Sequence, residues 1–507
     1  MISTERTAAS GGWWRHLNGY HWFVFVLAAF GWLFDTMDQQ LFTMSRSITM
    51  TALFPGAGFE VQANHGRLAT ALFIVGWATG GLIFGILGDK WGRAKTMASA
   101  IFVYAAFTGL SGLSTSFGQF AFFRLLTGIG VGGEFAVGAT LVAEAMPQQS
   151  RAGALGMLQA LSAIGNIMGV LLFGIIEPRK GFFGGWQGLY FMGAAPALLA
   201  VFVFLRLREP EKWVQARKKQ AALGAGTEQF GAISQLFTIP RWRRSTLVGL
   251  GLVTAGALTL WGAGFWASDL IDSTIPTVSA EVKPGLQAAI RLNPLPELAS
   301  LAMPERDVIK DLLNRIGPHP SAWPGLSTVE KSTVANLIDN SRTKSEKTRL
   351  KTQGGILQQI GAFFGMCAFG IISARIGHKK TFFWAFLLGW CSLILMFYGF
   401  RHPHQVYYMW PLMGICVLAP FGGYAVYLPE LFPTRLRSTG ISFCYNVARY
   451  LTAAGLYYMS DIATHFNWAF GLEGFRVLSL AISCAYLVGF VALIWAPETS
   501  GQPLPED

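Results

Sequence analysis

Residues 85–95 read GILGDKWGRAK, and 285 residues later the chain reads GIISARIGHKK, at 370–380. A second pair of segments, EAMPQQSR at 144–151 and ELFPTRLR at 430–437, is related by almost the same offset, 286 residues. Two independent pairs with nearly equal offsets are hard to obtain by chance. The sequence therefore predicts an internal duplication, in which the second half of the chain repeats the first.

The regions around these motifs are apolar enough to cross a membrane. Of the 507 residues, 52% are hydrophobic and 13% are charged, whereas soluble domains carry about 25% charged residues. A run of about 20 apolar residues spans the hydrocarbon core as a helix, which satisfies its own backbone hydrogen bonds. Twelve such runs lie at 22–44, 68–88, 96–117, 119–142, 153–176, 187–206, 245–269, 353–373, 381–400, 407–428, 439–460 and 475–496. The predicted fold class is an all-α membrane protein with twelve transmembrane helices.

The repeated motifs lie at helix ends on one side of the membrane. A third match places Glu211 of EPEKW opposite Glu498 of APETS, at an offset of 287 residues. Each copy contains six spans, and an even number of crossings makes the two copies parallel. We expect two pseudo-symmetric six-helix bundles, with a substrate site between them near the middle of the bilayer.

The duplication also sets the expected domain boundaries. The parts are an N-terminal bundle at 1–206, a cytosolic linker at 207–244, a C-terminal bundle at 245–498, an extracytoplasmic insert at 271–352 and a cytosolic tail at 499–507. Inside the insert, 304–317 and 327–340 are expected to be helical, and a Ser327-x-x-Glu330 capping box opens the second helix. The insert is either a lid or a docking surface, and the sequence leaves that choice open.

The net charge of +12 follows the topology of the chain rather than indicating nucleic-acid binding. If the N-terminus is cytosolic, the loops on that side are basic, with nine Lys and Arg between Arg206 and Arg244, whereas the short opposite loops hold few. This positive-inside bias places both termini in the cytosol. Residues 1–16 are polar and lack the apolar segment of a signal peptide. The expected location is a cell membrane, which is the inner membrane if the source is bacterial.

Three motifs resemble the major facilitator superfamily over nearly the whole chain outside the insert. GILGDKWGRAK is similar to the loop 2–3 signature G-x-x-x-D-[RK]-x-G-R-[RK], with one extra residue before Lys95. RLLTGIGVGGE at 124–134 resembles the fourth-helix pattern, and PELFPTRLRSTG at 429–440 resembles the loop 10–11 motif of sugar and metabolite porters. We expect the glycines of the fourth span to permit close helix packing: Gly128, Gly130, Gly132 and Gly133.

Within that superfamily, D-x-x-D in the first span and GGE in the fourth resemble the metabolite–proton symporters. Those branches carry lactate and pyruvate, sialic acid or aromatic acids. The second-half loop departs from the pattern, because Ala374 and His378 stand where the first half has Asp89 and Arg93. The gate on that side is therefore expected to be looser or differently wired in the second half.

Charged residues at cytosolic helix ends latch the gate of the resembled carriers when they face outward. The resemblance assigns this role to Asp89, Arg93, Glu144, Arg151, Glu430, Arg435 and Arg437. Glu134 joins the gate by depth, since a helix rise of about 1.5 Å per residue through a core of about 30 Å places it about 8 Å from the cytosol. The alternative is that these residues cap helices and follow the positive-inside bias.

Five charged residues lie well inside the predicted spans, and such residues are costly in lipid: Asp35, Asp38, Arg124, Glu134 and Arg449. The helix rise of about 1.5 Å per residue places Asp38 and Arg124 at matching depths. Burial and the like charge of Asp35 favour protonation of Asp38, and Arg124 opposes it. We expect these three residues to couple transport to protons. The alternative is a static ion pair that fixes helix register.

Arg449 lies about 15 Å into the eleventh span, near the midplane. Spans seven to twelve hold no acidic residue that is available to neutralise it. A buried guanidinium presents a fork of donors that suits a carboxylate. Asn446, Gln159 and Asn166 lie at comparable depths and complete the expected substrate site. The alternative for the three amides is hydrogen bonding between helices.

The leading functional hypothesis is proton-coupled symport of a small organic anion, expected to be a monocarboxylate. One negative charge that enters with one proton crosses without net charge movement. A sugar porter is the second hypothesis, because PELFPTRLRSTG occurs in sugar carriers, although Arg449 and the D-x-x-D pair weigh against a neutral substrate. A third hypothesis is a non-transporting receptor that uses the insert at 271–352 as its reporter.

Enzymatic activity is not expected, because HExxH, GxSxG and GxxxxGK[ST] are all absent from the sequence. The five cysteines fall inside predicted spans and form no metal-binding or disulfide pattern. The expected cofactor is none beyond the proton. The expected partners are a small organic anion and the lipid bilayer, without nucleic acid, and the expected assembly is a monomer.

Overall fold

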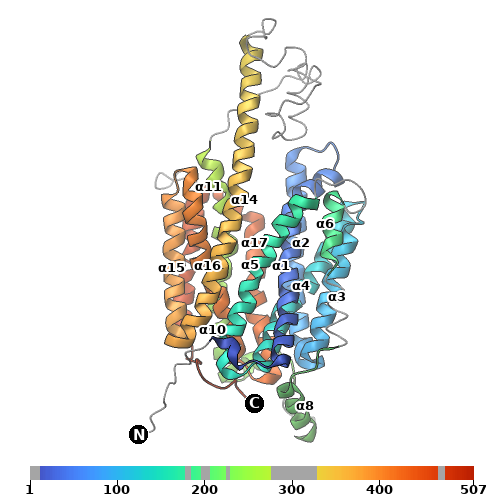
Figure 1. Cartoon of the computed structure of the whole chain (residues 1–507), viewed down its shortest axis with the longest axis vertical. Coiled ribbons are helices and arrows are strands. Elements are labelled where there is room, and N and C mark those ends of the chain that lie inside the picture. The colour runs from blue at the N-terminus through green and yellow to red at the C-terminus, as the bar shows by residue number, and fades with distance from the viewer. Residues whose placement is uncertain are drawn as a thin grey trace. The chain divides into compact units, whose positions relative to one another are not determined.

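The computed structural model describes residues 12–176, 184–195, 206–223, 229–275, 328–465 and 474–506. All regular elements within those ranges are helical (Figure 1). The chain divides into two compact units. Unit 1 contains Met1–Trp266, Leu357–Gly399 and Met409–Asp507, and unit 2 contains Ala267–Ile356 and Phe400–Tyr408.

The first half of the chain forms six helices of unit 1 at the positions of the first six predicted spans. They are α1 (Gly19–Leu53), α2 (Phe59–Trp91), α3 (Arg93–Ser111), α4 (Phe117–Ala145), α5 (Gln148–Ile176) and α6 (Gly185–Gly193). The last part of the sixth predicted span, 196–205, lies outside the described residues. α4 packs against α2 and α3, and α1 packs against α5. These long helices run along one common direction (Figure 1).

The second half repeats this arrangement. Its helices are α10 (Pro240–Ala257), α14 (Thr328–Ile376), α15 (His378–Gly399), α16 (Val406–Leu431), α17 (Arg437–His465), α18 (Gly474–Ser483) and α19 (Tyr486–Trp495). α10 continues into a π-helical turn at Leu258–Ala263, and α18 with α19 corresponds to the twelfth predicted span. Nine helices among the described residues are long and apolar enough to cross a membrane, and each coincides with a predicted span.

The linker and the insert differ from expectation in detail. The linker holds α8 (Glu211–Leu223) and α9 (Gln235–Thr238). The predicted helix at 327–340 is the first part of the 49-residue helix α14 rather than a separate element. Ser327 of the expected capping box and the predicted helix at 304–317 lie outside the described residues. Within unit 2, Lys351 of α14 pairs with Asp272 of α11 (Ala267–Thr274) at 2.6 Å.

Glycines let α2 and α4 approach more closely than any other side chain would allow. A Cβ atom on Gly132 would lie 2.0 Å from the carbonyl oxygen of Trp77, and one on Gly80 would lie 1.9 Å from that of Ile129. Gly130 of α4 is equally close to Tyr104 of α3. Small residues replace the hydrophobic drive that helices lack in lipid. The predicted packing role of the fourth-helix glycines is confirmed.

The duplication is visible where α3 and α15 begin. Gly92 and Gly377 precede these helices with φ angles of 112° and 92°, in the left-handed region that glycine adopts without strain. Glu209 accepts hydrogen bonds from the backbone N–H groups of Arg93, Ala94 and Lys95 at the start of α3.

At the start of α15, Glu498 accepts from the backbone N–H groups of His378 and Lys379, at 2.9 and 3.1 Å. Its counterpart in the first half is therefore Glu209. The pairing of Glu211 with Glu498 predicted from the sequence is wrong by two residues. Similarity of the letters EPE and PET guided that pairing, whereas the physical requirement is a carboxylate that can reach unpaired N–H groups at a helix start.

Candidate functional site

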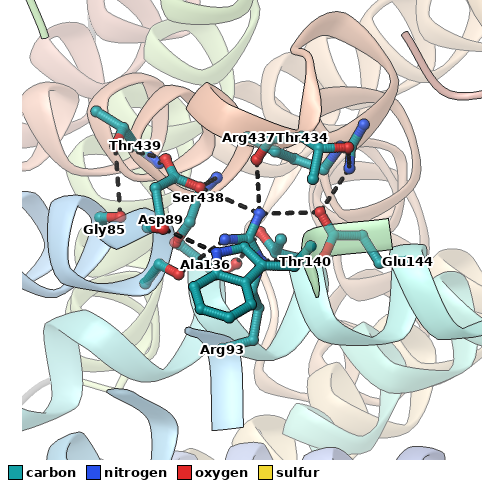
Figure 2. A network of polar contacts seen from close by, with 12 residues as sticks. Gly85, Asp89, Arg93, Ala136, Thr140, Glu144, Thr434, Arg437, Ser438 and Thr439 are labelled. Carbon is teal, nitrogen blue, oxygen red and sulfur yellow. Dashed lines mark hydrogen bonds and ion pairs between the residues drawn. The ribbon is translucent and has the colours of Figure 1, made fainter. Parts of the chain in front are cut away.

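A buried polar network joins the two halves where α2 and α4 end and α17 begins (Figure 2). We name it the latch and define it by Asp89, Arg93, Glu144, Thr434, Arg437, Ser438 and Thr439. Arg93 pairs with Asp89 at 3.2 Å and with Glu144 at 2.9 Å, and it donates to the carbonyl oxygen of Thr434 at 2.6 Å. Glu144 also pairs with Arg437 at 2.6 Å. Glu144 is thus held by one arginine from each half.

Asp89 caps the first turn of α17 from the other half. Its carboxylate accepts from the backbone N–H groups of Ser438 and Thr439, at 3.2 and 2.9 Å, and from the Thr439 hydroxyl at 2.7 Å. The start of a helix carries unpaired N–H groups and a partial positive charge. Separation of the halves at this end must therefore break a charge–dipole contact as well as the ion pairs.

The second half lacks the matching cap. Ala374 replaces Asp89 in the repeat and carries no carboxylate, so only one half caps the other. The Arg93–Glu144 pair corresponds to His378 and Glu430, whose Nε2 and Oε2 atoms lie 3.0 Å apart. The prediction that the second-half loop is differently wired agrees with this geometry.

Two gate candidates are symmetric partners, and one serves the linker. Arg151 Nε donates to the carbonyl oxygen of Ala143, and Arg437 Nε donates to that of Pro429, both at 3.0 Å. Arg435 donates to the side chain of Gln235 in α9, which belongs to the linker. Sequence reasoning missed Thr434, Ser438 and Thr439. Their position within six residues after Pro433, where a new helix begins, is the signal that identifies them.

Glu134 lies far from the latch, contrary to its predicted place in the gate. A Cβ atom on Gly31 would lie 1.9 Å from Glu134 Oε1, so this carboxyl group faces α1. The predicted fourth span ended at residue 142, but α4 continues to Ala145. Eleven residues at about 1.5 Å each place Glu134 about 16 Å from that end. Glu144 occupies the position expected for Glu134.

The predicted pair of Asp38 and Arg124 is present in the bundle interior. Asp38 Oδ2 lies 3.6 Å from Arg124 Nη1, and both side chains are buried. Thr108 donates to Asp38 at 3.2 Å. Arg124 also donates to the hydroxyls of Ser111 and Thr127, and its guanidinium lies 4.9 Å from the ring centre of Tyr190. An ion pair, two hydroxyl groups and an aromatic ring therefore hold this arginine.

Arg449 has a different environment. Its guanidinium lies 3.8 Å from the ring centre of Trp77 and 4.6 Å from that of Tyr445, and it donates to the side-chain oxygen of Asn446. The side chain is 6% exposed, yet no carboxylate among the described residues forms an ion pair with it. Arg449 therefore forms a donor site over an aromatic floor, and Asn446 accepts one of its N–H groups. Trp77 comes from the other half and was not predicted.

The two other predicted amides do not join that site. Asn166 of α5 donates to Gln359 of α14 at 3.2 Å, so the alternative role of bonding between helices describes it. Gln159 is buried, and its side-chain oxygen has no hydrogen-bond partner among the described residues. Within the described part of the chain, no hydrogen bond links either amide to Arg449.

The sequence has relatives that are named as transport proteins. The chain is 23% identical to a putative metabolite transport protein of Haemophilus influenzae, over 96% of this chain and 99% of the relative. It is 23% identical to the cis,cis-muconate transport protein of Acinetobacter baylyi, over 96% and 97%. It is 24% identical to a sialic acid transporter of Escherichia coli, over 94% and 96%.

Solved structures share the fold. The proton:xylose symporter XylE bound to 6-bromo-6-deoxy-D-glucose aligns with a TM-score of 0.64 at 16% identity, over 96% of this chain and 98% of that one. The predicted all-α, twelve-helix membrane fold is confirmed. Residues 39–329 match the sequence profile of the Major Facilitator Superfamily. Because this match covers more than half of the chain, the protein belongs to the Major Facilitator Superfamily of membrane transporters.

Proposed function

We propose that this protein is a proton-coupled symporter that carries a small organic anion across the cell membrane by alternating access. The observation that carries the proposal is Arg449, a buried guanidinium that has an amide oxygen and two aromatic rings as partners but no carboxylate among the described residues. A buried arginine with no carboxylate in contact is costly. An anionic substrate removes that cost while it is bound.

The chemistry of the site suits a carboxylate. The planar guanidinium presents two parallel N–H donors, which match two carboxylate oxygens. Trp77 and Tyr445 lie against the guanidinium, so we expect a carboxylate to bind at its edge. Muconate and sialic acid, which two relatives are named for carrying, are both carboxylic acids. A monocarboxylate is the simplest substrate that one arginine would bind.

Proton coupling is assigned to the acidic cluster on α1. Asp38 and Arg124 form a neutral pair when both are ionised. Movement of Arg124 away from Asp38 would leave a buried carboxylate, which binds a proton because desolvation disfavours its charged form. A proton that moves with a monoanion makes the cycle electroneutral, so an inside-negative potential does not oppose uptake.

The latch supplies the conformational part of the cycle. It holds α2 and α4 of the first half against α17 of the second. We assign this end to the cytosolic side, with both termini in the cytosol, because the basic loops lie there. In the structure the carrier is closed at that end, and it must break the latch to release substrate inward.

The test is uptake into proteoliposomes of a panel of labelled acids, including muconate, sialic acid and lactate, beside xylose. With an inward pH gradient, at least one acid should accumulate. Loss of two charge-assisted hydrogen bonds, each worth about 1.5–3 kcal/mol, predicts that Arg449→Gln weakens binding of that acid by about 100-fold or more. Arg449→Lys keeps the charge but not the fork, and it should also fail.

The matched control is the thermal stability of each variant, which must stay near wild type for the comparison to count. Normal transport by Arg449→Gln would refute the assignment of Arg449 as the anion-binding residue. If xylose accumulates, no acid is transported and no acid inhibits xylose uptake, the sugar-porter alternative replaces the anion proposal.

A further inference from the structure

Glu134 is a buried acid that the proposed mechanism does not yet use. It is 1% exposed, and neither of its carboxyl oxygens has a hydrogen-bond partner among the described residues. Oε1 occupies the space beside Gly31, where a side chain would otherwise stand. The rings of Trp32 and Phe135, 4.8 Å apart, pack α1 on α4 next to this contact. The carboxyl group is thus built into the helix interface.

Asp35 lies one helical turn from Gly31 on the same face of α1, because residues four apart share a face. It is completely buried. Its Oδ1 atom has no partner among the described residues, and its Oδ2 atom accepts one long bond, 3.4 Å, from Gln39. The charges that act on Asp35 are those of Glu134, Asp38 and Arg449. The phenol of Tyr104 on α3 faces the three acids Glu134, Asp35 and Asp38.

Two ionised carboxylates in this setting would be strongly unfavourable. Each would lose its hydration, and they would repel one another in a medium of low dielectric constant. Arg124 offers no relief, because Asp38, Ser111 and Thr127 engage it. Ionisation of Asp35 is favoured only by the long hydrogen bond from Gln39 and by the charge of Arg449. Acid pairs in such places bind one proton between them and titrate as a unit.

We infer that Asp35 and Glu134 form a second proton site, distinct from Asp38 and Arg124, which holds one shared proton and is balanced electrically by Arg449. Of the five charges, three acids face two arginines, so one bound proton makes the cluster neutral. The further step rests on the proposed function: a substrate carboxylate that neutralises Arg449 leaves the pair unbalanced, and the pair then takes up a second proton. Arg449 would in this way link anion binding to proton binding.

The first part is testable without a substrate, by infrared spectroscopy of the lipid-reconstituted protein at neutral pH in H₂O and D₂O. The protonated pair should give the carbonyl stretch of a carboxylic acid, shifted in D₂O. Glu134→Gln and Asp35→Asn should each lose that band completely, because Arg449 balances the one carboxylate that remains. Thr140→Val is the matched control. Thr140 is buried on the same helix as Glu134 and donates to a carbonyl oxygen of that helix, so this variant should keep the band.

If both acid variants retain the band, the proton site is refuted. If only one variant loses it, the proton belongs to that single residue and the shared pair is refuted. If Glu134→Gln fails to fold, retention of the band in Asp35→Asn would by itself overturn the pair. The band does not depend on transport. A protein that shows it but accumulates no acid would refute the proposed function while the proton site stands.

A second and independent observation concerns the segment Ala496–Glu506, which follows α19. Glu498 and Thr499 tie it to the second half, through the start of α15 and through Glu430. It then crosses to the first half, where Gln148 of α5 donates to the carbonyl oxygen of Gly501 at 2.6 Å. Arg437 of the latch donates to that of Pro505 at 3.2 Å, and Leu504 is buried.

We propose that this segment is a strap that keeps the halves together beside the latch and must detach before that end opens. Gln148→Ala and removal of residues 500–507 should each speed the reaction of a maleimide with a cysteine placed at buried Ser442, in a cysteine-free background, by several-fold. Gln502→Ala is the matched control, since Gln502 bonds only within the segment. Equal rates in all variants would show that the strap has no role in opening.

Discussion

Arg124 and Arg449 are both buried guanidinium groups, and what surrounds them separates their roles. Arg124 donates to two hydroxyls and pairs with Asp38, so its charge is compensated in the resting protein. Arg449 rests on two aromatic rings and one amide oxygen, which leaves charge for a ligand. A compensated pair is suited to exchange a proton, and a cation with no carboxylate in contact is suited to bind an anion.

At this scale, we expect Asp38→Asn to abolish uphill uptake driven by a pH gradient and to leave exchange of substrate across the membrane intact. The amide mimics the protonated acid, and exchange requires no net proton release. Counterflow in proteoliposomes measures the second activity. Arg124→Ala should fail in both assays, because it leaves Asp38 without its counter-ion. If Asp35→Asn combined with Asp38→Asn still concentrates substrate, these acids are not the proton path.

The individual site residues were predictable to the extent that depth in a helix decides them. Helix rise alone brought Asp38 and Arg124 together. It misplaced Glu134, because the hydropathy pattern ended the fourth span three residues before α4 ends. The contact of Trp77 with Arg449 could not be predicted. Trp77 lies on a helix of the other half, and an indole in an apolar span does not indicate its partner.

At the scale of elements, the close approach of α2 and α4 depends on particular glycines. Gly132→Ala would place a methyl group 2.0 Å from a backbone oxygen, and overpacking of this kind typically costs about 1–3 kcal/mol. Gly138→Ala on the same helix is the matched control, because a Cβ there meets nothing within 4 Å. Thermal unfolding in detergent should show a lower midpoint for Gly132→Ala only. Equal midpoints would argue against steric control.

Because Glu498 caps α15, the stability of the folded protein is expected to depend on pH. Burial raises the pKa of this carboxyl, but the N–H donors of His378, Ser500 and Lys379 outweigh that effect, and the net pKa lies below its usual value. A lowered folded-state pKa gives stability that is complete above the unfolded pKa of about 4.3 and is lost as the pH falls through the folded value. Caps contribute about 1 kcal/mol, and the partial exposure of Glu498 makes this an upper value.

Glu498→Gln tests this cap without a large change of shape. Thermal unfolding measured from neutral pH down to below pH 4 should show a smaller loss of stability for the variant than for the wild type, and the two curves should converge at the acid end. Curves that stay parallel would show that another group titrates. The membrane spans were predictable from hydropathy. The cap by Glu498 and the corresponding cap by Glu209 were not, because they depend on how the chain folds back after the twelfth and sixth helices.

On the scale of the whole molecule, the duplication makes the two halves similar, and the latch makes them unequal. Asp89 caps α17 of the other half, while Ala374 has no side chain with which to return the contact. The sequence predicted this difference from the broken motif. It did not predict that Glu144 would receive one arginine from each half, because contacts between halves depend on which conformation the carrier adopts.

Asp89→Asn should therefore shift the carrier toward the state that is open at the latch end. The amide keeps the size of the side chain but loses the charge that faces Arg93 and the start of α17, and loss of one member of a buried ionic network costs about 3–5 kcal/mol. Because only the closed state contains this contact, the loss falls on that state alone. A cysteine at Ser442 should then react with an impermeant maleimide at least 10-fold faster than in the wild-type background, and from the cytosolic face only.

Vesicles of both orientations supply the two faces. Ala374→Ser, on the side without a cap, is the matched control and should leave the rate unchanged. Faster labelling from the external face would invert the assignment of the latch to the cytosol, and an unchanged rate would mean that the latch does not hold the gate.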